Sequence, residues 1–192
     1  MSLVDFKNFT RSDIQALVHT IGLLGDNIVG VELGVFEGAS FLTLLHNCPN
    51  IKTLHGVDIY KPYDDYIKIP YDGTVGMKVD KPTSEIIRAV SFTRQKYSGM
   101  TDKIVFHEDD STAVASKFED ESIDFIFMDS YCSYDQAKRE LEAWFPKVKK
   151  GGLFSGHDWE SYPIQKAVNE FRRENRMSNT LIAYSNTWSW RK

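Results

Sequence analysis

The chain has 192 residues, of which 27 are acidic and 23 are basic, so its formal net charge is −4 at pH 7. This length suits one well-buried domain over residues 1–192, the charge argues against a nucleic-acid partner, and no apolar stretch approaches the roughly 18–20 residues that cross a bilayer. The first residues lack the organisation of a signal peptide and the two cysteines, Cys48 and Cys132, are far apart, so we expect a cytoplasmic protein without a disulfide framework.

Hydrophobic periodicity predicts strands that alternate with helices along most of the chain. Helical spacing of apolar residues between capping residues and glycines indicates each helix, and short apolar runs indicate each strand. In chain order the expected elements are a helix over 10–24 within an N-terminal segment of 1–25, a strand over 28–33, a helix over 39–46, a strand over 51–58, a helix over 84–97, a strand over 103–107, a helix over 112–118, a strand over 123–128, a helix over 134–148, a strand over 153–155, a helix over 163–175 and two strands over 180–185 and 188–190.

Residues 60–82 carry no clear period and are rich in proline and tyrosine. We expect them to form a long loop, because a segment of this length without periodicity in a compact domain is usually functional or mobile. The loop directly follows the strand over 51–58, so its aromatic and acidic residues would cover a ligand or line a substrate site. A solvated surface loop is the equal alternative.

Alternating strands and helices predict a mostly parallel sheet that is covered by helices on both faces. The last two strands break this alternation, and the short turn at 185–187 predicts that they form an antiparallel hairpin. The expected fold is therefore an α/β domain with a doubly wound, mostly parallel sheet of seven strands and an antiparallel C-terminal hairpin. Such sheets bind ligands beyond the carboxyl ends of the strands, near the point where the strand order reverses.

Polar residues end five of the apolar runs, at the edge where this fold binds its ligands. The turn after the first strand contains Gly34 and Gly38, whose missing Cβ atoms let the backbone bend sharply and let a ligand lie close to it. The helix that follows points free N–H groups at that turn. An acidic residue beside glycines suits a ligand with hydroxyl groups and a positive charge. The polar strand ends are Glu32, Asp58, Asp109–Asp110, Asp129 and His157–Asp158.

Five motifs come in the order and spacing of class I S-adenosylmethionine-dependent methyltransferases, which the chain resembles over about residues 28–190. It is most similar to the bacterial branch of sugar and catechol-type O-methyltransferases. The resemblance implies a Rossmann-like fold and methyl transfer to a small hydroxylated molecule, such as a sugar or a secondary metabolite. The motifs are Glu-x-Gly-x-x-x-Gly at 32–38, Gly-Val-Asp at 56–58, His-Glu-Asp-Asp-Ser at 107–111, Phe-Ile-Phe-Met-Asp at 125–129 and Gly-Gly-x-x-x-Gly-His-Asp at 151–158.

The resemblance also implies which residues hold the cofactor. The glycines would form the turn under its methionine portion, and Asp58 would accept hydrogen bonds from both ribose hydroxyls, because an ionised carboxylate only accepts. Asp110 would accept from the adenine amino group, with Ser111 beside it. The competing local explanations are a plain turn at the glycines, a solvated or capping Asp58, and a cap of the next helix by the residues around Asp110. The implied set is Glu32, Gly34, Gly38, Asp58, Asp110, Ser111 and Asp129.

Methylation of an alcohol also requires loss of the hydroxyl proton, to a positioned base or with the help of a divalent cation. We expect His157 and Asp129 to be the catalytic residues. Metal-using relatives place carboxylates at the ends of the fourth and fifth strands, so Asp129 and Asp158 would bind Mg²⁺ or a similar hard cation. Where the family commonly has an Asp and a His, this chain has Tyr131 and Cys132. This departure favours proton transfer by His157 without a metal, or a different acceptor pocket that Tyr131 shapes; a plain turn at 157–158 is the structural alternative for His157 and Asp158.

Two other functions stay open at this stage. A catalytically silent domain that binds S-adenosylmethionine would fit the loss of polar groups at Tyr131 and Cys132. An NAD-dependent oxidoreductase would share the sheet, the first turn and an acidic residue after the second strand, although the turn lacks the Gly-x-Gly-x-x-Gly pattern of those enzymes. For the methyltransferase we expect a small-molecule methyl acceptor as partner. A homo-oligomer is compatible with the sequence.

Overall fold

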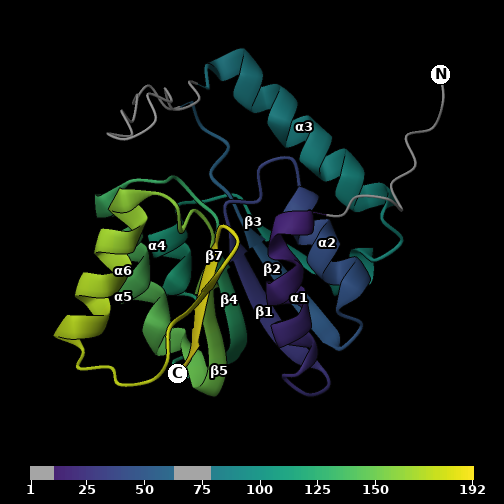
Figure 1. The fold of residues 1–192 in the computed structure, drawn as a ribbon. Coiled ribbons are helices and arrows are strands. Elements are labelled where there is room, and N and C mark those ends of the chain that lie inside the picture. The colour runs from purple at the N-terminus through teal and green to yellow at the C-terminus, as the bar shows by residue number, and fades with distance from the viewer. Residues whose placement is uncertain (1–10, 63–78) are drawn as a thin grey trace.

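A central sheet organises the part of the chain that the computed structural model describes, residues 11–62 and 79–192 (Figure 1). Its strands are β1 (Ile28–Leu33), β2 (Ile51–Val57), β3 (Ile104–His107), β4 (Ile123–Met128), β5 (Val148–Gly156), β6 (Ile182–Tyr184) and β7 (Thr187–Arg191). They form one seven-stranded sheet in the order β3-β2-β1-β4-β5-β7-β6. Neighbours from β3 to β5 are parallel, and β7 runs antiparallel to both β5 and β6. The expected mostly parallel sheet with an antiparallel C-terminal hairpin is confirmed.

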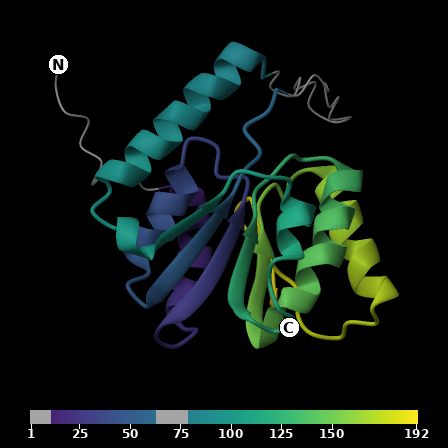
Figure 2. The same ribbon diagram turned by 180° about the vertical axis from the view of Figure 1, so that it is seen from behind.

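Helices cover both faces of the sheet, as the alternating pattern predicts. On one face lie α4 (Ser111–Ala115), α5 (Tyr134–Trp144) and α6 (Tyr162–Glu174), and on the other lie α1 (Gln15–Gly22) and α2 (Ala39–Asn47). The longest helix, α3 (Lys81–Tyr97), crosses one end of the molecule, above the strands in both views (Figures 1 and 2). Short 3₁₀ helices occupy Ser12–Ile14, Thr101–Lys103 and Phe145–Lys147. Within residues 11–62 and 79–192, none of the helices has the length and apolar composition needed to span a membrane.

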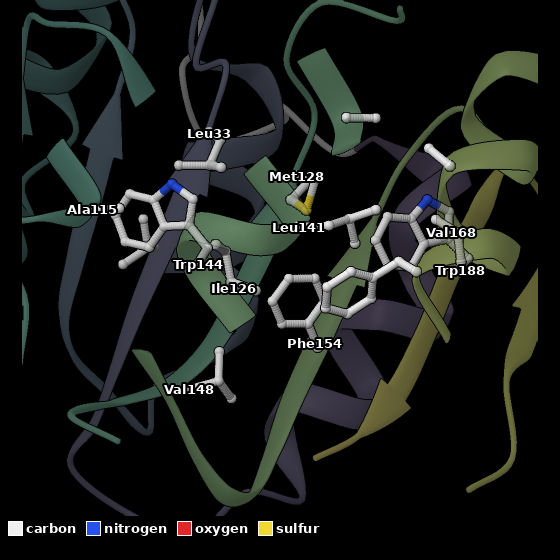
Figure 3. Packing of buried hydrophobic residues seen from close by; sticks show 14 of the residues in the cluster. Leu33, Ala115, Ile126, Met128, Leu141, Trp144, Val148, Phe154, Val168 and Trp188 are labelled. Carbon is white, nitrogen blue, oxygen red and sulfur yellow. The ribbon is translucent and has the colours of Figure 1, made fainter. Parts of the chain in front are cut away.

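The central strands are buried on both faces, which is why their sequences are continuous apolar runs. Figure 3 shows Leu33 of β1 and Met128 of β4 within the apolar layer that Trp144 of α5 and Phe154 of β5 complete. Leu33 pairs with Met128 in the parallel register of these two strands. The backbone N–H of Asp129 donates to the carbonyl oxygen of Leu33 at 2.8 Å. Core packing therefore places the residues that follow β1 and β4 side by side.

The N-terminal helix is shorter than its periodicity suggests. The 3₁₀ helix Ser12–Ile14 leads into α1, which has 8 residues, and Ser12 does not cap it; Thr10, the other expected cap, lies outside the described residues. No side chain caps either element, because Arg11, which precedes the 3₁₀ helix, has a side chain that only donates hydrogen bonds, and Ile14, which precedes α1, has an apolar side chain. Buried Ile14 ties this segment to the core.

Two other boundaries differ from the expected ones. The helix expected over 134–148 ends at Trp144, because Pro146 cannot donate the backbone hydrogen bond that an α-helix needs, and β5 already begins at Val148. Helix α3 begins at Lys81, where Asp80 accepts a hydrogen bond from the backbone N–H of Thr83 at 2.9 Å. The last part of the expected 60–82 loop is therefore helical, and its residues 63–78 lie outside the described part of the chain.

Candidate active site

A cavity of about 1100 Å³ opens beyond the carboxyl ends of β1, β2 and β4. Because β1 and β4 are the neighbours at which the strand order reverses, the cavity lies at the switch point where open α/β sheets bind ligands. Its volume exceeds the roughly 300–1,000 Å³ of a typical small-molecule pocket, so it offers room for a cofactor and a small substrate together. Expected site residues in its lining are Gly34, Asp58, Asp110, Ser111, Asp129 and Asp158.

The turn between β1 and α2 is held tightly against the end of β4. Gly34 and Gly38 have φ angles of +83° and +86°, a backbone conformation that side chains disfavour. A Cβ on Gly34 would lie 2.2 Å from the carbonyl oxygen of Asp129, which is far inside contact distance. Among the described residues, a Cβ on Gly38 would meet only Ser91 Oγ, at 3.7 Å. The turn is thus closed on the side of β4 and open at the N-terminus of α2.

Glu32 lies buried beneath this turn. Its Oε1 accepts a hydrogen bond from Ser40 Oγ at 2.6 Å, whereas its Oε2 has no hydrogen-bond partner in the described part of the chain. Burial raises the pKa of Glu32 well above its ordinary value, against the effect of the Ser40 hydrogen bond. A buried acceptor without a partner carries a free-energy cost, which a donor from a bound ligand would relieve.

Asp58 joins the turn after β1 to the loop after β2. Its Oδ2 accepts from the backbone N–H of Phe36 at 2.8 Å, and its Oδ1 accepts from that of Tyr60 at 2.9 Å. The Tyr60 ring stacks on Phe106, and its hydroxyl donates to the carbonyl oxygen of Phe36 at 3.1 Å. Burial raises the pKa of Asp58, although these backbone bonds oppose the shift. Asp58 also lines the cavity, so its carboxylate is placed to accept hydrogen bonds from a ligand.

Asp110 and Ser111 line the cavity but also have structural partners. Asp110 Oδ1 caps α4, accepting from the backbone N–H groups of Thr112 at 3.0 Å and Ala113 at 3.1 Å. The hydrogen bond from the Thr112 hydroxyl is the main reason that the pKa of Asp110 is lowered. Ser111 Oγ donates to Glu140 at 2.5 Å. The capping explanation considered for this segment therefore holds for Asp110 itself, and its role toward a ligand stays a prediction.

Glu140 is a cavity residue that sequence reasoning missed. It is buried on α5 and accepts from three side chains: Ser111 Oγ, Ser130 Oγ at 2.6 Å and Gln136 Nε2 at 2.7 Å. Burial raises its pKa despite these bonds. The network connects α5 to the residues after β3 and β4, and so fixes one wall of the cavity. The sequence does not indicate that Glu140 is buried, because an acidic residue among the charged residues of an amphipathic helix usually faces solvent.

Asp129, His157 and Asp158 come together at the ends of β4 and β5. His157 Nδ1 lies 3.0 Å from Asp158 Oδ1 and 3.3 Å from Asp129 Oδ1. Burial raises the pKa of Asp129 to about 6, although nearby cations oppose this shift. For His157 and Asp158 burial works against the charged forms, but their mutual hydrogen bond and charges outweigh it, so the pKa of His157 is raised and that of Asp158 is lowered. One atom from each of the three lies within 4.8 Å of the others, which is a donor set that could hold a metal ion.

Arg11 reaches into this group from the N-terminal segment. Its Nη1 donates to Asp129 Oδ2 at 2.5 Å, and its Nη2 donates to Asp13 Oδ2 at 2.7 Å. His157 Nε2 lies 2.7 Å from Arg11 Nη2 and 2.8 Å from Asp13 Oδ2. The ion pair with Arg11 is the main reason that the pKa of Asp13 falls to about 2. Sequence reasoning missed both residues, because they stand at the start of a helix and meet their partners more than a hundred positions away.

Three expected site residues stand outside the cavity lining. Glu32 lies beneath the turn, Gly38 begins α2, and His157 contacts the carboxylates that do line the cavity. The departures from the family pattern, Tyr131 and Cys132, both line it. Burial raises the pKa of Cys132 to about 12, and its Sγ lies 3.0 Å from Ser161 Oγ, so this thiol is no nucleophile at neutral pH.

Comparison of the sequence with family models identifies one match. Residues 31–159 match a family described as methyltransferase domain, which includes the turn after β1, the end of β4 and the end of β5. No curated protein matches the sequence.

Solved structures with the same fold are numerous and distant in sequence. The O-methyltransferase NovP is 18% identical with a TM-score of 0.65, over 92% of this chain and 79% of NovP. CalS11, a calicheamicin methyltransferase, is 17% identical with a TM-score of 0.60, over 97% of this chain and 82% of CalS11. A putative rRNA-methylase from Clostridium thermocellum is 10% identical with a TM-score of 0.63, over 94% of each chain. At these identities the similarity shows the fold, and the acceptors named for these proteins differ widely.

Proposed function

The chain belongs to the family of S-adenosylmethionine-dependent methyltransferases, and from that premise we propose that it methylates a hydroxyl oxygen of a small molecule such as a sugar or a secondary metabolite. The observation that carries the proposal is the large cavity that Gly34, Asp58 and Asp129 line together at the switch point of the sheet. A cavity of about 1100 Å³ suits a nucleoside cofactor beside a small acceptor. The net charge of −4 also favours a small acceptor over a nucleic acid.

The residues present fit S-adenosylmethionine. The turn from Gly34 to Gly38 lets the N–H groups of the backbone and of the following helix approach the ligand. Beneath the turn, Glu32 Oε2 is a buried acceptor without a hydrogen-bond partner among the described residues. Asp58 is held by backbone N–H groups, those of Phe36 and Tyr60 among them, and lines the cavity, where it would accept from the ribose hydroxyls. Asp110 and Ser111 follow β3, where they would contact the adenine of the cofactor, as the family resemblance implies. We propose these residues as the cofactor site.

The bound cofactor supplies a methyl group on a positively charged sulfur, so the protein must mainly align the acceptor and remove its proton. We propose Asp129 as the proton acceptor, because it lines the cavity and, with a pKa of about 6, is ionised at neutral pH. His157 contacts Asp129 at 3.3 Å and Asp158 at 3.0 Å without lining the cavity. In this proposal His157 orients the carboxylates of Asp129 and Asp158 and offsets their negative charge when it is protonated.

Calorimetric titration with S-adenosylmethionine tests the cofactor site, and NAD serves as the comparison ligand. We expect S-adenosylmethionine to bind and NAD to show no binding. Methyl transfer is then measured with radiolabelled cofactor against a panel of sugars, catechols and other hydroxylated metabolites. Binding of the cofactor without transfer to any panel member would favour a silent binding domain, and preferential binding of NAD would overturn the proposal.

A further inference from the structure

A guanidinium group lies beside the residues that could hold a metal ion. Of the two oxygens of Asp129, Oδ1 lies 3.3 Å from His157 Nδ1 and Oδ2 accepts from Arg11 Nη1 at 2.5 Å. The same guanidinium lies 2.7 Å from His157 Nε2. The three residues that could hold a metal ion are Asp129, His157 and Asp158, and Arg11 directly contacts two of them.

The fold fixes Arg11 in this position. Its backbone N–H donates to Thr43 Oγ1 on α2 at 3.2 Å, and its carbonyl oxygen accepts from the N–H of Ile14 at 3.4 Å. Ile14 is fully buried among the side chains of α1 and α2. Asp13 then holds the far side of the guanidinium, through Nε at 3.2 Å and Nη2 at 2.7 Å. The position of the guanidinium therefore follows from core packing and from three hydrogen-bonded or charged neighbours, Asp13, Asp129 and His157.

Positive side chains already offset part of the negative charge of the site without a metal ion. Asp13, Asp129 and Asp158 bring three negative charges; Arg11 brings one positive charge, and His157 brings a second when it is protonated, which leaves a net charge of −1. A divalent cation at Asp129 and Asp158 would lie a few ångströms from a fixed guanidinium, and like charges at that distance repel strongly in a partly buried site. It would also compete with Arg11 for the carboxylate of Asp129. This donor set therefore does not fit a divalent cation while Arg11 is in place.

We propose that Arg11 takes the place of the divalent cation in this chain: it positions Asp129 and His157 and keeps Mg²⁺ and similar ions out of the site. The proposal rests on the proposed methyltransferase function and deepens it, because it assigns acceptor activation to side chains. Arg11 is a positioning residue, since it acts through Asp129 and His157. The planar guanidinium suits this role, because its separate N–H groups donate to the carboxylates of Asp13 and Asp129 at the same time.

The test is a titration with Mn²⁺ as the probe, followed by electron paramagnetic resonance, without cofactor or acceptor. The site is defined as Mn²⁺ binding that Asp158→Asn removes. We expect no such binding in the unaltered protein, and one such site in Arg11→Ala with at least about tenfold higher affinity, since the carboxylate of Asp129 then becomes available beside that of Asp158. Arg11→Lys, which keeps the charge, should again exclude the ion. Arg88→Ala is the matched control, because it removes an arginine that pairs with Glu108 on the surface.

Two results would overturn the proposal. One is that the unaltered protein binds Mn²⁺ and the Asp158→Asn variant does not; this comparison requires no change at Arg11. The other is an Arg11→Ala protein, folded by circular dichroism, that gains no such site. If Arg11→Ala does not fold, Arg11→Gln replaces it, because glutamine keeps a polar side chain without the charge. Calorimetry with S-adenosylmethionine on the same preparations judges the methyltransferase proposal separately, so either proposal can fail while the other stands.

Discussion

Replacement of Gly34 by alanine should be the most damaging single-methyl change in the site. At φ +83° an alanine costs about 1–2 kcal/mol relative to glycine. The new Cβ would also lie 2.2 Å from the carbonyl oxygen of Asp129 and 2.6 Å from Cα of Ser130. Both are backbone atoms that cannot rotate away, so overpacking adds about 1–3 kcal/mol. The unfolding free energy should fall by about 2–5 kcal/mol, and displacement of Asp129 should abolish methyl transfer.

The matched controls separate backbone strain from the clash. Gly25→Ala meets the same kind of strain at φ +96°, and apart from its chain neighbours no atom of residues 11–62 and 79–192 lies within 4 Å of the new Cβ; Gly38→Ala meets it at φ +86° with the nearest such atom at 3.7 Å. Each should lose only about 1–2 kcal/mol in urea denaturation. The three variants are compared by urea titration and by calorimetry with S-adenosylmethionine. A Gly34→Ala protein as stable as Gly25→Ala, with unchanged cofactor affinity, would refute the tight approach of this turn to β4.

Three further changes test other parts of the site. Asp58→Ala should weaken S-adenosylmethionine binding by at least about 1.5 kcal/mol in calorimetry, the scale of a charged hydrogen bond; an unchanged affinity would remove the ribose assignment. Because the pKa of Asp129 is raised from 3.8 to about 6, its contribution to stability is present below pH 3.8 and is lost as the pH rises to about 6, so Asp129→Asn should flatten the pH dependence of unfolding in that range. The ionised form appears over the same range, so kcat/KM should rise with pH up to about 6 and then level. Excess chelator should leave methyl transfer unchanged if Arg11 replaces the cation, and loss of activity that Mg²⁺ restores would contradict this.

The fold was predictable because its signals are local and repeated. Continuous apolar runs such as 28–33 and 123–128 identify strands that are buried on both faces. Polar residues at their ends then identify the binding edge, since parallel strands bring their carboxyl ends together. In this way Asp58, Asp129 and Asp158 were expected at one cavity, and all three line it. The boundaries that were wrong depend on weaker signals, such as the cap at Asp80 and the end of α5 before Pro146.

What the sequence could not predict depends on contacts between distant segments. Glu140 reads as one more charged residue on a helix, and only the packing of α5 against β3 and β4 shows that it accepts three hydrogen bonds. Arg11 meets Asp129 at a separation of 118 residues. No periodicity or motif encodes such a pair, because it depends on where α1 lies relative to the sheet.

The position of Arg11 also bears on why the chain can lack the family's polar pair after β4. In relatives that carry an Asp and a His there, those groups add to the charge and proton exchange of the site. Here Tyr131 and Cys132 stand in their place, and Arg11, Asp13 and His157 contact one another beside Asp129. The N-terminal segment therefore supplies two charged groups, Arg11 and Asp13, to a site that lacks the polar pair after β4.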